Sequence, residues 1–132
     1  MTPTKASSFA DPADVRAFER CKAKGGTDQQ CFKVGDNGRG CWGDLTAQTH
    51  TPMCALPPQV MEAQWGSVAK ARHRRVRVHC FRTKRTVLCV LADRMPRKPN
   101  SSGAGIDLNP AASAALGLTP PHLEPVEWAW EA

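Results

Sequence analysis

The stretch VLCVLADRMPRKPNSSGAGIDLNPAASAALGL, residues 87–118, decides the fold of this 132-residue chain. It begins inside an apolar and β-branched run, Thr86–Ala92, which is too short for a typical helix and predicts a buried strand. The strand ends at Asp93, an ionisable side chain placed where a hydrophobic strand meets a loop. Prolines and the Ser101–Gly105 run then predict an irregular loop. The first half of the stretch is therefore predicted to carry a carboxylate to the mouth of a core strand.

The second half of the stretch predicts a short strand followed by a capped helix. Ile106–Leu108 resumes the extended chain, and Asn109 is a favourable N-cap residue. Pro110 is suited to the first helical position, alanines fill the helix, and Gly117 is suited to end it. Each of these local choices has a physical reason, so we expect a strand, a cap and a short helix in that order.

Sequences on both sides of this stretch predict further strands. Arg75–Phe81 alternates between apolar and basic residues, and a turn connects it to Thr86–Ala92 as a hairpin partner. Leu123–Trp130 also alternates and predicts the last strand. Cys41–Leu45 is predicted as the first strand of the sheet, and Ser67–Ala71 as a weak one. Five to six short strands with a lone helix are typical of a small β-barrel.

The N-terminal part of the chain has a different pattern. The first ten residues are predicted to be a mobile lead-in. Asp11 is a favourable N-cap, with proline next to it, for a helix that runs to Lys24. Thr27 or Asp28 is suited to cap a second short helix. We therefore expect an N-terminal extension with one or two helices over residues 1–33, and a barrel domain over residues 34–132.

The motifs DRMP and GIDLNPAASAALGL resemble the end of the double-psi β-barrel domain of rare lipoprotein A, the expansins and the endoglucanases related to expansins. Met95 stands where the lipoprotein branch has glycine, and Asn109 where it has serine. The resemblance implies an all-β fold, a six-stranded double-psi β-barrel with one short helix after the IDLN motif. It also implies a protein that acts on a polysaccharide or on peptidoglycan.

By this resemblance, Asp93 takes the place of the acid in glycan cleavage of the lytic transglycosylase or endoglucanase type. A carboxyl at the mouth of an apolar strand is also where burial raises a pKa toward the range that a general acid needs. Asp44 is the expected second carboxylate, because it follows Trp42-Gly43 much as a base aspartate follows Tyr-Trp in the endoglucanases. The lipoproteins carry a histidine shortly before Leu-Pro. In this chain no histidine occupies the corresponding position before Leu56-Pro57, and His50 is the nearest histidine.

Other candidate residues complete the predicted site. Trp42, Trp65, His50 and Arg94 are predicted to bind substrate, since sugar rings stack on aromatic planes. The four tryptophans are equally suited to fill the core. In the IDLN motif, Asp107 and Asn109 are predicted to have structural roles, Asp107 by bonding backbone groups in a loop.

The charge distribution favours an alternative function. The net charge is +6, and eleven of the eighteen basic residues lie between Lys70 and Lys98. The Lys70–Arg85 patch is suited to a polyanion such as nucleic acid or an anionic wall polymer, or it is simply a solvated strand face. The sequence leaves open whether the protein is an enzyme. The alternatives are a non-catalytic glycan-binding or structural expansin-like module, and a basic polyanion binder.

Six cysteines indicate an oxidising compartment or buried thiols, and their pairing is open. Cys21 with Cys31, and Cys80 with Cys89, flank short turns. The spacing matches no zinc motif, so neither a metal nor another cofactor is expected. No apolar run reaches the roughly 18 residues of a membrane span, and no signal peptide is recognisable. We expect a monomer that is extracytoplasmic, or exported by a non-classical or phage-related route.

Overall fold

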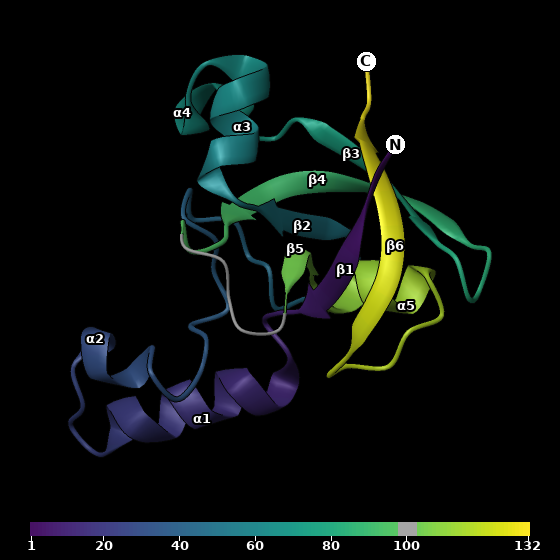
Figure 1. The fold of residues 1–132 in the computed structure, drawn as a ribbon. Coiled ribbons are helices and arrows are strands. Elements are labelled where there is room, and N and C mark those ends of the chain that lie inside the picture. The colour runs from purple at the N-terminus through teal and green to yellow at the C-terminus, as the bar shows by residue number, and fades with distance from the viewer. Residues whose placement is uncertain (98–102) are drawn as a thin grey trace.

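The structure, a computed structural model, describes residues 1–97 and 103–132, and its strands close into a barrel (Figure 1). The order around the barrel is β1-β5-β2-β4-β3-β6. The strands are β1 (Thr2–Ser8), β2 (Met53–Leu56), β3 (Arg75–Cys80), β4 (Thr86–Arg94), β5 (Ala104–Leu108) and β6 (Leu123–Trp130). The helices are α1 (Pro12–Ala23), α2 (Asp28–Cys31), α3 (Pro58–Trp65), α4 (Val68–Ala71) and α5 (Pro110–Ala115). The predicted six-stranded β-barrel is confirmed.

The barrel mixes parallel and antiparallel pairs. β1 runs parallel to β5, and β2 runs parallel to β4, whereas the other four neighbouring pairs are antiparallel. Parallel neighbours need long crossover connections, and α1 to α4 lie in these connections. As a result the short strand β2 lies between β4 and β5, two strands that are not paired with each other.

Alternation along the strands builds the core. Val76, Val78 and Cys80 of β3 are fully buried, while Arg75 and Arg77 between them are exposed. Burial of every second side chain is the expected pattern for a strand with one face on the core. The other large, fully buried side chains of this cluster are Leu56, Met61, Leu91, Ile106, Leu108, Leu116 and Val126. The alternation predicted for β3 and β6 is confirmed.

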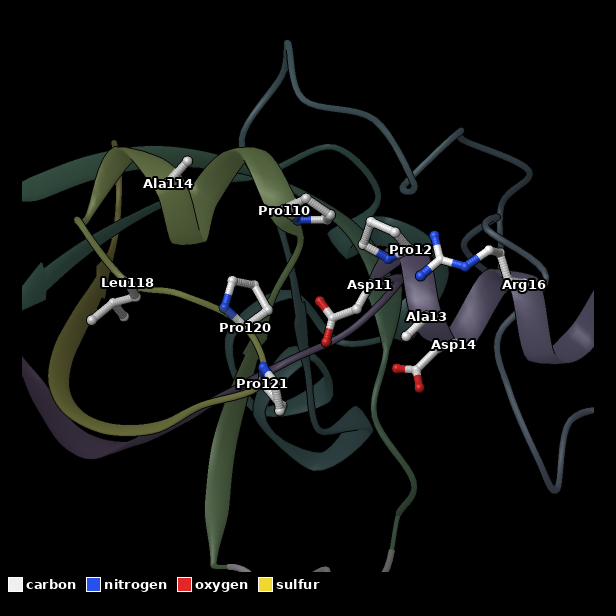
Figure 2. A pocket seen from close by; sticks show the side chains of 10 residues that line it. All are labelled: Asp11, Pro12, Ala13, Asp14, Arg16, Pro110, Ala114, Leu118, Pro120 and Pro121. Carbon is white, nitrogen blue, oxygen red and sulfur yellow. The ribbon is translucent and has the colours of Figure 1, made fainter.

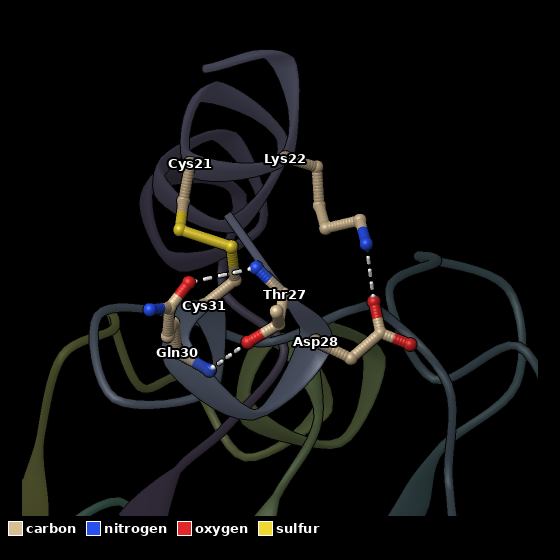
Figure 3. The surroundings of a disulfide bond; sticks show 6 residues. All are labelled: Cys21, Lys22, Thr27, Asp28, Gln30 and Cys31. Atoms are coloured by element: carbon tan, nitrogen blue, oxygen red, sulfur yellow. Dashed lines mark hydrogen bonds and ion pairs between the residues drawn. A yellow bond between two sulfur atoms is a disulfide. The ribbon is translucent and has the colours of Figure 1, made fainter. Parts of the chain in front are cut away.

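The α1–α2 helices project from the barrel and are tied together by a disulfide (Figures 1 and 3). Cys21 and Cys31 are bonded, which confirms one of the two pairings that the turns suggested. Thr27 caps α2 in a capping box with Gln30, and this satisfies backbone N–H groups at the helix start. The predicted short second helix is thus confirmed.

The side chain of Asn109 is fully buried between three segments. Its Oδ1 accepts hydrogen bonds from the Ala112 N–H (3.0 Å), which caps α5, and from the Met53 N–H (2.8 Å) at the start of β2. Its Nδ2 donates to the carbonyl oxygens of Thr46 and Thr51, each at 3.1 Å. The predicted cap is confirmed, and the same amide also holds β2 and the loop before it.

Several expected elements are wrong. The predicted lead-in contains β1, which is paired with β5 and β6, so a barrel strand precedes the helices of the expected extension. Cys41–Leu45 is a loop closed by one bridge between Arg39 and Leu45, and residues 68–71 are helix α4 rather than strand. β1 owes its form to pairing with strands distant in sequence, which local patterns do not show, whereas α4 begins at a Ser67 cap that the sequence contains.

Two further expectations concern loops and cysteines. The loop predicted for Ser101–Gly105 lies partly outside the described residues, and β5 already begins at Ala104. Cys80 and Cys89 are both buried free thiols. They do not face each other, because Cys89 lies opposite Val76 in the β3–β4 pair.

Replacing Asn109 by alanine is expected to destabilise the fold strongly. The change leaves the buried N–H groups of Ala112 and Met53 without their acceptor, and each orphaned donor costs on the order of 1–3 kcal/mol. The carbonyl oxygens of Thr46 and Thr51 each keep a hydrogen bond from Gln48. We expect a loss of at least about 2 kcal/mol in the free energy of unfolding, measured by urea denaturation. Asn109→Ser is the matched control, because serine is also a favourable N-cap residue and can keep the bond to the Ala112 N–H, and it should lose less. A loss below about 1 kcal/mol for the alanine variant would show that the amide is not an anchor.

Candidate functional site

A row of four residues crosses four neighbouring strands on the outer face of the barrel. Ser7 of β1 is in register with Asp107 of β5, Asp107 with Ala55 of β2, and Ala55 with Asp93 of β4. Residues paired across neighbouring strands point to the same face of a sheet. Ala55 is 1% exposed and packs with Phe9 outside the main core cluster, so this face is the outer one.

The two carboxylates of this row flank the small methyl group of Ala55. Neighbouring strands are about 4.8 Å apart, so the Cα atoms of Asp93 and Asp107 lie about 10 Å from each other. Their side chains also interact electrostatically, since the charge of Asp93 contributes to the raised pKa of Asp107. The register of β2 therefore brings together two acids that are separated in sequence by a loop.

Of the acids in this row, Asp107 has the pKa that is shifted most from its ordinary value. Burial raises its pKa from the ordinary 3.8 to about 6. The Ser7 hydroxyl donates a hydrogen bond to its Oδ1, which favours the ionised form, and the neighbouring acids Asp93, Asp11 and Asp36 oppose ionisation. The sequence predicted a structural role through backbone bonds, whereas the structure shows a half-buried carboxyl poised near neutral pH.

Asp93 lies at the end of β4, as predicted, and is held by backbone groups. Its Oδ1 accepts hydrogen bonds from the Cys41 N–H (2.9 Å) and the Arg94 N–H (2.8 Å). Burial raises its pKa, and these two bonds act in the opposite direction. The loop reaches Asp93 only because residue 40 is glycine, since a Cβ there would collide with the Ala92 carbonyl oxygen. Gly40 thus places the Cys41 N–H on the carboxylate.

A cavity of about 480 Å³ opens beside Asp93. Its polar lining includes Arg94, Arg39 and a third acid, Asp36. Burial raises the pKa of Asp36, and a 2.6 Å hydrogen bond from the Gly38 N–H lowers it. The position of Asp36 beside Asp93 arises from the fold of the 32–41 segment and from its contact with the end of β4.

The predicted partner Asp44 lies in different surroundings. Its carboxylate oxygens are both 2.9 Å from Nε2 of His73, and it is not among the residues that line the cavity beside Asp93. Trp42 packs edge-on to His73, with the ring centroids 6.5 Å apart. The structure therefore joins the side chains of Asp44 and Trp42 to His73, while the Asp44 carbonyl oxygen accepts a 2.9 Å hydrogen bond from the Gly40 N–H in the loop that holds Asp93.

The other predicted substrate-binding residues are dispersed. Arg94 is exposed and lines the Asp93 cavity. Trp65 is covered by the Arg74 guanidinium 3.8 Å from its ring centroid, and packs edge-on to Trp130 at 5.5 Å. His50 is exposed in the 46–51 loop, where its N–H donates to Gln48. Of these three residues, only Arg94 lies beside the acids.

Within residues 1–97 and 103–132, no three His, Cys, Asp or Glu side chains are grouped so as to hold a metal ion. No helix in this part of the chain has the length and apolar character required to cross a membrane.

Comparison with known proteins adds to the description of the fold. No protein-family model matches the sequence, and no curated protein matches it. Among solved structures, the chain is similar to the Streptomyces papain inhibitor, with 19% identity and a TM-score of 0.50. The match covers 97% of this chain and 92% of that one. It supports a barrel of double-psi type, and does not single out rare lipoprotein A or the expansins.

The pH dependence of stability is expected to carry the signature of Asp107. Because its folded pKa is raised, the folded state binds the proton more tightly than the unfolded chain does. The stabilisation is present below the ordinary pKa and is lost as pH rises through about 6. Between pH 4 and pH 7, wild type should therefore lose about 2 kcal/mol of unfolding free energy that Asp107→Asn does not lose, measured by urea denaturation at both pH values.

Ser7→Ala provides the matched control for this measurement. Removing the hydroxyl that favours the ionised form should raise the pKa of Asp107 further and enlarge the difference between pH 4 and pH 7. If Asp107→Asn changed the free energy of unfolding by the same amount at pH 4 and at pH 7, the raised pKa of Asp107 would be contradicted.

Proposed function

We propose that this chain cleaves a polysaccharide on the outer face of β2, β4 and β5, with Asp107 as the proton donor. The observation that carries the proposal is the register of Ala55, which pairs with Asp93 on one side and with Asp107 on the other. Glycan cleavage uses an acid that protonates the leaving oxygen and a second group that completes the reaction. Two carboxylates on one face supply both groups.

The surroundings of the two acids support different roles. A general acid must be protonated near the working pH, and a pKa of about 6 suits Asp107 to this task. Asp93 accepts two backbone hydrogen bonds, which favour its ionised form, so it is suited to act as base or to stabilise positive charge on the sugar. This assignment exchanges the roles expected from the sequence, in which Asp93 was the acid.

Charge near the site supports an anionic wall polymer such as peptidoglycan as the substrate. Arg39 and Arg94 line the cavity beside Asp93, and the chain as a whole carries a net charge of +6. A basic protein attracts an anionic polymer from a distance, and a cationic rim favours its approach to the acids. The Cys21–Cys31 disulfide is typical of the oxidising compartments in which such polymers occur.

The predicted polyanion patch is partly neutralised. Arg77 forms a two-fold hydrogen-bonded pair with Glu131, and Arg82 pairs with Glu124 at 2.8 Å. These contacts consume two of the cations in Lys70–Arg85. We therefore favour glycan cleavage over nucleic-acid binding as the function. Inhibition of papain, named for the structural neighbour, is not extended to this chain, because 19% identity supports the fold alone.

Release of reducing or anhydro ends from purified peptidoglycan strands and from soluble cellulose tests the proposal. We expect wild type to cleave one of them, with activity falling as pH rises above about 6 because Asp107 loses its proton. Asp107→Asn should lose activity by a factor of about 100 or more. Asp93→Asn should also be impaired.

Asp44→Asn is the control, because it changes a carboxylate that is bonded to His73 and does not line the cavity beside Asp93. It should retain wild-type activity. No cleavage by wild type, or full activity in Asp107→Asn, would overturn the proposal. An inactive Asp44→Asn beside an active Asp107→Asn would instead restore the pair predicted from sequence.

A further inference from the structure

A second cavity, of about 460 Å³, lies between the start of α1 and the segment that connects α5 to β6 (Figure 2). Four prolines form much of its wall, namely Pro12, Pro110, Pro120 and Pro121. Proline rings are apolar and rigid, so the wall is suited to a hydrocarbon chain. Leu118 and two alanines add to the apolar surface.

One buried carboxylate is directed into this cavity. Asp11 is 8% exposed, and Figure 2 shows its carboxylate extending from α1 toward Pro120 and Pro121. Its Oδ2 accepts a 2.9 Å hydrogen bond from the Ser8 hydroxyl, while its Oδ1 is buried without a hydrogen-bond partner among the described residues. An unpaired buried acceptor of this kind is unfavourable, and a donor that reached it would stabilise the site.

A second carboxylate lies at the rim. Asp14 is exposed and also lines the cavity. Arg16 is the cation of the lining, but Figure 2 shows its guanidinium beside Pro12 rather than at either carboxylate. The cavity therefore combines apolar walls with two carboxylates that face a common space. Such a combination repels anions, and it favours a ligand with a positive end and an apolar stem.

We propose that this cavity binds a primary aliphatic amine, with the hydrocarbon stem against the prolines and the ammonium group between Asp11 and Asp14. The ammonium group carries three N–H donors, enough to serve the unpaired oxygen of Asp11 and the rim carboxylate together. A neutral alcohol of the same length would contact the apolar walls equally well, but it would leave the negative charge of the two carboxylates uncompensated. The cavity shares no lining residue with the cavity beside Asp93, and although Asp11 contributes to the raised pKa of Asp107, this proposal does not depend on the proposed function.

Titration of ¹⁵N-labelled protein with pentylammonium chloride, at constant ionic strength and followed by NMR, tests the proposal. We expect saturable shifts of amides that surround the cavity, such as those of Ala13, Ala114 and Leu118. Pentan-1-ol should bind at least about 10-fold more weakly, since a hydrogen bond to a charged group contributes about 1.5–3 kcal/mol. Equal binding of amine and alcohol, or no saturable shift with the amine, would overturn the proposal.

Three variants locate the binding. Asp14→Asn, at an exposed position, should weaken amine binding at least about 10-fold without affecting the fold. Ala114→Leu, on the exposed side of α5, should fill the cavity and abolish binding of amine and alcohol alike. Asp28→Asn removes an exposed acid that is paired with Lys22 on the α1–α2 unit, and should bind like wild type. If Asp28→Asn weakened binding as much as Asp14→Asn, the amine would be responding to overall charge, and the cavity site would be refuted.

Discussion

One buried amide, that of Asn109, holds together the parts of the molecule on which the site depends. It caps α5, receives the first N–H of β2 and binds two carbonyl groups of the preceding loop. β2 has only four residues, too few to maintain its register by its own ladder against two neighbours. Once Met53 is held, Ala55 two residues later is placed between β4 and β5, and with it the positions of Asp93 and Asp107. Fold and candidate site thus share one anchor.

Much of the fold could be predicted because its signals are local. The alternation of β3 and β6, the apolar run of β4, and the caps of α2 and α5 follow from neighbours in sequence. β1 could not be predicted in this way. Only one of its residues, Ala6, is fully buried, and the strand exists because β5 and β6 pair with it on both sides. Residues 41–45 show the opposite error, since a plausible strand sequence lies where no neighbour is available beyond one bridge.

Only part of the candidate site could be predicted from the sequence. Asp93 was identified because it ends an apolar strand, and Arg94 beside it lines the same cavity. For Asp107 the sequence predicted a structural role. Its position across β2 from Asp93 depends on the strand register, which the sequence does not show. Asp36 joins these acids only through the folded loop. Burial raises the pKa of all three and also that of Asp11.

The most direct measurement of this account is the titration of the Asp107 carboxyl itself. Carboxyl ¹³C shifts of aspartate-labelled protein, followed by NMR from pH 3 to pH 8, give the pKa of each resolved side chain, and Asp107→Asn identifies the resonance. We predict that the resonance lost in the variant titrates near pH 6, and that Asp93→Asn lowers the pKa of Asp107, since a neighbouring negative charge has been removed. An Asp107 resonance that titrates near pH 4 would contradict the account.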